Sequence, residues 1–355
     1  MDIHVLDSSL NLVGVIDRYT SLIWRPSYYE VGDFELYLDA STENVDALKK
    51  NYYLVRTQDI STDASGNIVY KKVMVIKNHK INTDIEGGDY LTVTGRELKF
   101  ILNQRIVWSQ TNLSGNVATA IERLVNENAI EPSDTNRVIP NLELDTTLEI
   151  SDTITKQITG DKLDAAITEI CKTYNLGYDV YIKGQKFMFK LYQGVDRSST
   201  PPYVVFSEAF ENILNSEFER VTEQYANTAL VAGEGEGTAR KTATVNSDNT
   251  GLDRYEVYID DRDSSTNEDE ITGAQYLNIL KEYGVEKLSE YAITEAFTGE
   301  VQHDSNFKYG EDYFLGDTVT VTNKYGMSGS VRVLSAIESD DESGAKLIPQ
   351  FNGGA

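Results

Sequence analysis

The chain has 355 residues, with 57 acidic and 32 basic side chains and a formal net charge of −25 at pH 7. This charge disfavours non-specific binding to nucleic acid or to an anionic membrane surface, because both repel an acidic protein. With 40% hydrophobic and 25% charged residues, the composition is that of a folded protein long enough for two or three domains, each with its own core.

Residues 1–103 are predicted to form a first, small β-barrel-like domain. Short apolar runs recur with turn residues between them, and Phe34–Leu38 alternates between apolar and polar residues with a period of two, which is typical of a strand. One short helix is expected to begin after Ser41, its predicted N-cap, with Val45 and Leu48 facing inward.

Residues 104–204 are predicted to form an α+β domain. Apolar residues at three- and four-residue steps indicate one helix after Ser114, its predicted N-cap, and a second helix that begins at Asp161. Cys171, the single cysteine, lies on the apolar face of the second helix, so we interpret it as a core residue and not as a nucleophile. The clearest hairpin of the chain is expected over residues 178–192.

Residues 205–355 are predicted to form a second β-barrel-like domain with a helical insertion at about residues 268–292. The helix itself is expected over Glu270–Tyr291, with Glu268 and Asp269 near its start, where carboxylates interact favourably with the helix dipole. The order of the three regions predicts an α+β, β-rich fold. In this fold two small β-barrel-like domains are separated by an α+β domain in which helices pack on a hairpin.

A glycine-rich segment at residues 227–242 follows an apolar, strand-like run. Its alternating glycines resemble a phosphate-binding loop, but Glu234 and Glu236 between them would repel a phosphate, and no helical periodicity follows. The segment is therefore predicted to be a long strand or a hairpin. Its glycines would allow bulging, tight twisting or the close approach of another backbone.

Few groups in the sequence suit catalysis or metal binding. His4, His79 and His303 are not spaced as metal ligands, and each lies among polar residues of a predicted strand or loop. The acidic run 261–272 lacks the glycine and the glutamate that a calcium-binding loop needs. We therefore expect no enzyme, no cofactor and no bound metal.

Six short motifs are spread over nearly the whole chain: Gly14–Asp17, Ser21–Trp24, Gly32–Leu36, Gly95–Leu98, Asn227–Gly237 with Arg240, and Tyr313–Val319. Their order and spacing resemble the prophage and siphophage Gp37-like tail proteins, a family related in fold to the baseplate hub subunit of phages. The resemblance implies a structural role in a trimeric ring. In such a ring, two β-barrel-like domains per subunit give six similar positions, which match a sixfold tail tube to threefold tip proteins.

The resemblance also implies the partners and the location of the protein. The expected partners are two further copies in a homotrimer, the tail tube or a distal tail protein, and tail-tip or receptor-binding proteins. Genomic DNA would pass through the lumen without specific binding, and no membrane partner is expected. The expected location is the virion tail, after assembly in the host cytoplasm. Glu234, Glu236 and Arg240 are then expected near a subunit or lumen surface.

Two other classes of function stay open. Some relatives of the tail-tip group are cell-wall-directed endopeptidases or hydrolases, and such an enzyme would need a base with a nucleophile or a metal in a cleft. A carbohydrate-binding receptor module would need exposed aromatic side chains that stack on sugars. Because few residues follow the last predicted strand, Leu347–Phe351, we expect no appended enzyme domain.

Overall fold

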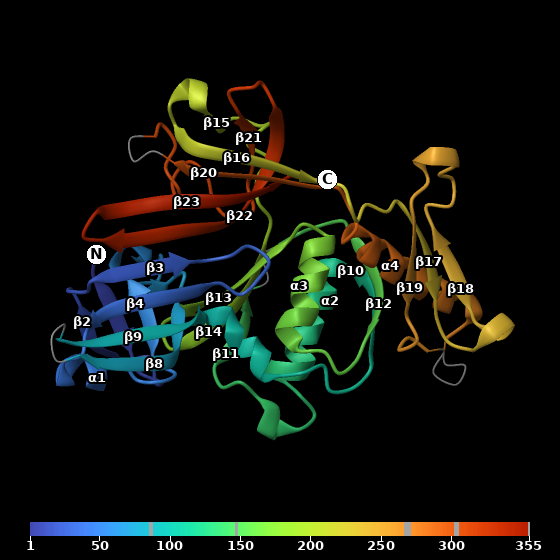
Figure 1. The fold of residues 1–355 in the computed structure, drawn as a ribbon. Coiled ribbons are helices and arrows are strands. Elements are labelled where there is room, and N and C mark those ends of the chain that lie inside the picture. The colour runs from blue at the N-terminus through green and yellow to red at the C-terminus, as the bar shows by residue number, and fades with distance from the viewer. Residues whose placement is uncertain (85–87, 146–147, 266–270, 302–304, 354–355) are drawn as a thin grey trace.

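A computed structural model describes residues 1–84, 88–145, 148–265, 271–301 and 305–353. Strands outnumber helices, which agrees with the predicted α+β, β-rich class. Figure 1 shows a β-rich lobe from each end of the chain, a central region that contains helices, and a smaller lobe at the side. Among the described residues, no helix is both long and apolar enough to cross a lipid bilayer.

One 13-stranded sheet contains strands from both ends of the chain. Its N-terminal strands are β1 (Ile3–Leu6), β2 (Leu12–Ile16), β3 (Ser21–Arg25), β4 (Asp33–Asp39), β5 (Tyr53–Arg56), β8 (Met74–Asp84) and β9 (Gly88–Glu97). Its C-terminal strands are β15 (Val205–Ser207), β16 (Ile213–Val221), β20 (Thr294–Val301), β21 (Thr318–Thr322), β22 (Ser328–Asp341) and β23 (Gly344–Gly353).

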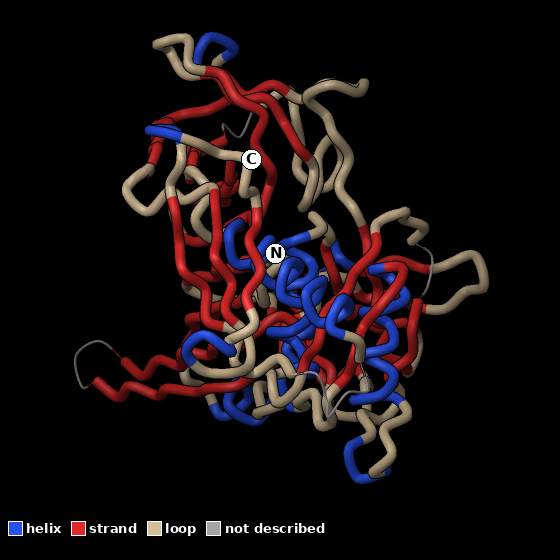
Figure 2. The backbone as a smooth tube through the Cα atoms, turned by 90° about the vertical axis from the view of Figure 1, so that its right-hand side faces the viewer, coloured by secondary structure: helices blue, strands red, loops and turns tan. Residues whose placement is uncertain are grey.

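The order along this sheet is β16, β20, β23, β22, β3, β4, β9, β8, β5, β1, β2. β21, with β15 beyond it, pairs with the same edge of β22 as β3 does, but at the other end of the strand. Neighbouring strands are antiparallel except β15 and β21, which run parallel. Figure 2 shows the hairpin of β8 and β9 extending away from the body of the molecule, and its distal residues, 78–84, are exposed.

β22 joins the two β-rich lobes. Its last residues pair with β3, from Glu338 opposite Trp24 to Asp341 opposite Ser21, while its first residues pair with β21. The described strands form no closed barrel, and the division into two β-barrel-like domains stays a prediction. β22 has 14 residues, so it is long enough to serve both lobes. It occupies the edge of β3 with which β2 would have to pair to close a barrel.

The central region combines a two-stranded sheet, β10–β12, with a five-stranded sheet in the order β11, β14, β13, β7, β6. The predicted hairpin at residues 178–192 is confirmed as β13 and β14, with Tyr178 opposite Leu191. β6 and β7 come from the first hundred residues and extend this central sheet. The strands are β6 (Ile60–Thr62), β7 (Ile68–Tyr70), β10 (Thr111–Asn116), β11 (Leu142–Asp145), β12 (Thr153–Ile158), β13 (Gly177–Lys183) and β14 (Lys186–Tyr192).

The predicted helix caps are correct at one helix and wrong at another. Ser41 caps α1 (Thr42–Ala47) as predicted, because its side chain accepts a hydrogen bond from the backbone N of Asn44. Ser114 does not cap α2 (Val117–Val125). β10 continues to Asn116, and the side chain of Asn116 satisfies the backbone N of Thr119 at the helix start. Both outcomes follow from the rule that the capping residue is the last extended one.

The inward face predicted for α1 is half correct, because Leu48 is fully buried while Val45 is 38% exposed. The second predicted helix is α3 (Leu163–Thr173), which starts two residues after Asp161. The short helices are η1 (Thr57–Asp59), η2 (Leu98–Gln104), η3 (Asn126–Ile130), η4 (Thr135–Arg137), η5 (Glu208–Phe210), η6 (Gly237–Ala239) and η7 (Gly251–Asp253).

The small lobe is a three-stranded sheet covered on one face by α4 (Gly273–Ser289). Its strands are β17 (Thr228–Ala232), β18 (Thr242–Val245) and β19 (Glu256–Asp260), in the order β18, β17, β19. α4 lies inside the predicted helical insertion and begins after Thr272, which forms a capping box with Gln275. The three acidic residues predicted at its start, 268–270, lie outside the described residues.

Each part of the molecule has its own hydrophobic core. The central core, which packs α2 and α3 against the sheets, contains Cys171, and this confirms the interpretation of the cysteine as a core residue. Burial raises the pKa of its thiol to about 12. Trp24 lies in the N-terminal core, Phe206 in the C-terminal core and Tyr276 in the core of the small lobe.

Candidate assembly surfaces

The glycine-rich segment forms a hairpin in the small lobe, as one of its two predicted alternatives. β17 and β18 pair from Ala229 opposite Val245 to Ala232 opposite Thr242. At Gly233 a Cβ atom would lie 2.2 Å from the hydroxyl oxygen of Tyr276 on α4. The glycine therefore permits the close approach of a side chain of α4, whereas the prediction was the close approach of another backbone.

Arg240 holds the end of this hairpin to the neighbouring strand. Its guanidinium donates to the backbone oxygens of Ala232 and Gly233, both at 3.0 Å, and to the hydroxyl of Tyr258 at 2.9 Å. It also forms an ion pair with Asp260 on β19. The side chain of Arg240 is only 14% exposed, so its charge interacts mainly with groups of the same chain.

Glu234 and Glu236 lie in the loop between β17 and β18 but have different surroundings. The carboxylate of Glu234 pairs with Lys241 at 2.6 Å, and its backbone N donates to the hydroxyl of Tyr276 at 2.7 Å. Glu236 is exposed. Of the three predicted site residues, Glu236 is therefore the one whose charge is displayed on the surface.

The face of the small sheet opposite α4 carries exposed apolar side chains that the sequence analysis did not single out. Leu230 and Tyr258 lie side by side in register and are 44% and 56% exposed. The sequence of Thr228–Ala232 carries no apolar–polar alternation that could have revealed this face, although Ala229 and Val231 lie in the core and Leu230 is exposed.

The junction of the two β-rich lobes contains a buried ion-pair cluster. Arg56 has no exposed side-chain surface; its guanidinium lies 2.6 Å from a carboxylate oxygen of Asp59 and 2.9 Å from one of Glu338. Lys72 reaches the same two acids at 3.9 and 3.8 Å, and burial lowers the pKa of its amine. Because Glu338 lies on β22, the cluster links the N-terminal lobe to the C-terminal one.

A second buried group lies next to the Gly95–Leu98 motif. Glu97 accepts a hydrogen bond from the backbone N of Gly32 at 3.0 Å, and its carboxylate lies 3.3 Å from the amine of Lys99. The same amine donates to the backbone oxygen of Ser27 at 2.6 Å. Burial raises the pKa of Glu97, and the charge of Lys99 opposes this effect.

The Tyr313–Val319 motif also has a structural use. Gly316 has a φ of +87°, and a Cβ atom there would lie 2.2 Å from the ring of Tyr28. The carboxylate of the buried Asp317 accepts hydrogen bonds from the backbone N of Val195 at 2.7 Å and of Phe314 at 3.1 Å. The motif residues therefore fix turns between the central region and the C-terminal lobe.

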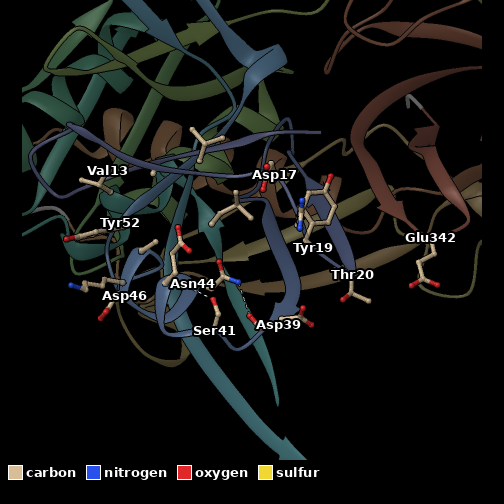
Figure 3. Close-up of a pocket in the computed structure, with 17 residues that line it drawn as sticks. Val13, Asp17, Tyr19, Thr20, Asp39, Ser41, Asn44, Asp46, Tyr52 and Glu342 are labelled. Carbon is tan, nitrogen blue, oxygen red and sulfur yellow. Dashed lines mark hydrogen bonds between the residues drawn. The ribbon is translucent and has the colours of Figure 1, made fainter. Parts of the chain in front are cut away.

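We call a hollow of about 910 Å³ the seam cleft. It is lined by β2 and the residues that follow β2, by α1, and by the turn after β22. Figure 3 shows side chains from all three elements around it, including Tyr19 and Glu342. Its lining contains five carboxylates and two basic side chains: Asp17, Asp39, Glu43, Asp46 and Glu342, and Arg18 and Lys49.

The candidate catalytic and metal residues do not come together in the described part of the chain. His4 lies on β1 opposite Val15, while His79 contacts the backbone oxygen of Leu48 through its Nε2. His303 and part of the acidic run 261–272 lie outside the described residues. No described group of three or more histidine, cysteine or acidic residues could hold a metal ion.

Comparisons with known proteins place the chain among phage tail proteins. The sequence model of the family described as Siphovirus ReqiPepy6 Gp37-like protein matches residues 2–351. No curated protein matches the chain in sequence.

Three solved structures have a similar fold. The tail protein from Neisseria meningitidis MC58 has a TM-score of 0.56 at 12% identity and covers 99% of this chain and 95% of its own. The prophage MuSo2 43 kDa tail protein from Shewanella oneidensis has a TM-score of 0.57 at 11% identity, with 99% and 98% covered. A chain of a PdpA–VgrG complex has a TM-score of 0.50 at 10% identity, with 99% of this chain and 64% of that chain covered.

Proposed function

Because the chain belongs to the Siphovirus ReqiPepy6 Gp37-like protein family of phage tail proteins, we propose that it is a structural subunit of a tail-tip or baseplate hub. In this role it joins the tail tube to the proteins that recognise the host. The observation that carries the proposal is the family match over residues 2–351, because it spans both β-rich lobes and the regions between them. The full-length similarity in fold to tail proteins supports it.

Three copies are proposed to form a ring. Each subunit has two β-rich lobes in one continuous sheet, so three subunits would present six strand-rich positions to a sixfold tube. The partners in this arrangement are the tail tube or a distal tail protein on one side and tail-tip or receptor-binding proteins on the other. The ring would be assembled in the host cytoplasm and reside in the virion tail.

The lumen of such a ring is proposed to be acidic. Three copies would carry three times the net charge of −25, and a wall of this sign repels the phosphates of passing DNA, so the genome would not be retained. Among the three residues predicted at a subunit or lumen surface, Glu236 is the best candidate because it is exposed. Glu234 forms an ion pair with Lys241, and Arg240 forms one with Asp260.

Electron microscopy and light scattering test the ring. We expect threefold particles from the purified chain at high concentration or with tail tubes added. Glu236→Lys should alter ring assembly or genome passage while the subunit stays folded, whereas Glu149→Lys, at an exposed site in the central region, should not. A strictly monomeric chain that also fails to join tail tubes would refute the hub. A normal ring with Glu236→Lys would instead return this loop to ordinary surface.

The hub is proposed to be non-catalytic. A cell-wall hydrolase would need a base together with a nucleophile or a metal in one cleft. Glu97 and Asp317, which belong to the Gly95–Leu98 and Tyr313–Val319 motifs, instead accept hydrogen bonds from backbone groups inside the fold. Release of fragments from purified cell walls, with zinc added, would contradict this part of the proposal and favour the hydrolase alternative.

A further inference from the structure

We propose that the seam cleft binds an extended, basic segment of another protein, which adds a strand to the open edge of β2. The inference does not depend on the trimeric ring, because it concerns a surface within one subunit. It rests on the unpaired strand edge, on the exposed apolar side chains along it and on the unbalanced charge of the cleft.

The outer edge of β2 is free to pair. Within the part of the chain that the structure describes, β2 pairs only with β1, from Ile3 opposite Ile16 to Leu6 opposite Leu12. β3, the strand that would close the lobe, is already paired on both edges, with β4 and β22. The outer edge of β2 therefore has no strand partner among the described residues, and an unpaired edge is the usual basis of β-strand addition.

The side chains of β2 favour an extended partner. Val13 and Val15 are 48% and 46% exposed and line the cleft. Val15 lies in the regular part of the strand and Val13 at a bulge, because Val5 and Leu6 pair with Gly14 and Leu12. Both β-branched side chains offer apolar contacts to an added strand. Native edges are usually protected by charged or proline residues at such positions. Neither kind of residue occurs within β2, Leu12–Ile16, where the regular pairing is interrupted only by the bulge at Val13.

The charge of the cleft selects the partner. Its lining has five carboxylates and two basic groups, and none of the five carboxylates forms an ion pair with another described residue. The acids come from separate elements, Asp17 after β2, Asp46 on α1 and Glu342 after β22. Such dispersed charge suits the long side chains of lysine and arginine along a peptide better than one metal ion.

The same charge argues against other occupants. A second copy of this chain, with 57 acidic and 32 basic residues, would bring two acidic clefts together if β2 paired with its own equivalent. Nucleic acid and anionic lipid would be repelled for the same reason. A volume of about 910 Å³ falls within the usual range of ligand-binding clefts, about 300–1,000 Å³, which is enough for several peptide side chains.

Fluorescence anisotropy with a short labelled peptide of alternating lysine and valine tests the proposal on the full chain. We expect saturable binding that weakens as salt is raised, because exposed charges are screened. Val15→Lys should weaken binding by about tenfold or more, because a charge on the edge opposes strand addition. The double variant Asp39→Asn with Asp46→Asn should weaken it by several-fold.

Matched controls separate the cleft from general charge effects. Ile68→Lys adds the same charge at a strand residue with the same exposure, 46%, and should bind the peptide as the unmodified chain does. A peptide with glutamate in place of lysine should not bind. Hydrogen exchange should show new protection of the backbone amides of residues 12–16 when the lysine peptide is bound.

Several outcomes would overturn the proposal. These are the absence of saturable binding, equal binding by Val15→Lys and the unmodified chain, or an equal loss with Ile68→Lys. Self-association of the peptide-free chain that Val15→Lys abolishes would identify the cleft as a contact between copies instead. If Val15→Lys does not fold, the asparagine double variant and the exchange of the β2 amides still decide the question.

Discussion

β3 and β2 each have an outer edge in the same lobe, but only the edge of β3 is paired with another described strand. At β3, β22 arrives from the other end of the chain, and Arg56 pairs with Asp59 and Glu338 in the buried space beside it. At β2, no described strand pairs with the outer edge, and the carboxylates of the seam cleft have no ionic partner in the described chain. Charge is thus enclosed where two lobes are joined and displayed where the lobe stays open.

This difference has an energetic reason. A buried charge must be paired, because desolvation of an unpaired ion costs several kcal/mol. An exposed carboxylate keeps its hydration and needs no partner within the chain. The closed edge therefore stabilises the arrangement of the lobes only while its ion pairs are complete, whereas the open edge tolerates substitution.

The largest effect is expected from Arg56→Met at the closed edge. The substitution leaves Asp59 and Glu338 without the guanidinium that lies 2.6 and 2.9 Å from them, so the free energy of unfolding should fall by about 3–5 kcal/mol. Arg18→Met, at an exposed arginine of the seam cleft, is the matched control and should change it by less than about 0.5 kcal/mol. Urea unfolding measures both, and equal losses would remove the contrast between the edges.

A smaller effect is expected from the buried carboxyl group of Glu97. Burial raises its pKa in the folded chain above the ordinary value of 4.5. Between pH 4.5 and the raised pKa, the folded chain therefore binds a proton at Glu97 that the unfolded chain has lost. The contribution of the protonated Glu97 to the free energy of unfolding is present at low pH and is lost as the pH rises from 4.5 through the raised pKa. Glu97→Gln should flatten this part of the pH profile of the urea midpoint.

Glu35→Gln is the control for this experiment, because Glu35 is an exposed acid on β4. It should leave the pH profile as it is in the unmodified chain. A profile that Glu97→Gln and Glu35→Gln change equally would show that the buried carboxyl is not responsible.

Local patterns in the sequence predict the local elements well. Alternating residues and a tight turn identify the hairpin at 178–192, and glycines next to glutamates separate the hairpin of β17 and β18 from a phosphate loop. Ser41 caps its helix because the cap needs only neighbouring residues. These features depend on interactions within a few positions, so the sequence shows them directly.

Long-range pairing could not be predicted in the same way. The strand pairing of Glu338 with Trp24 joins residues from opposite ends of the chain, and no pattern near either residue specifies it. The sequence therefore did not reveal that strands from both ends of the chain share one sheet. Arg56 was missed for the same reason, since it follows an ordinary strand sequence and meets Glu338 only in the folded chain.

The smallest effect is expected at the open edge, from Asp46→Lys in α1. Asp46 lies in the last turn of this helix, which has no basic residue. A carboxylate there interacts unfavourably with the helix dipole and with the other acids of the cleft. The substitution should raise the free energy of unfolding by about 0.3–1 kcal/mol, as urea unfolding would show, and weaken the lysine peptide in the anisotropy assay.

Asp46→Lys should stabilise the fold but weaken peptide binding, and these opposite effects distinguish a role of the cleft in binding from a role in folding. Asp46→Asn should give a smaller change of the same sign in each measurement, because it removes one charge without adding another. A loss of stability with Asp46→Lys would mean that the cleft acids support the fold itself, and the contrast with Arg56 would then be one of degree. A gain in stability with weaker peptide binding would show that the open edge keeps its charge for a partner, at a small cost to the stability of the subunit.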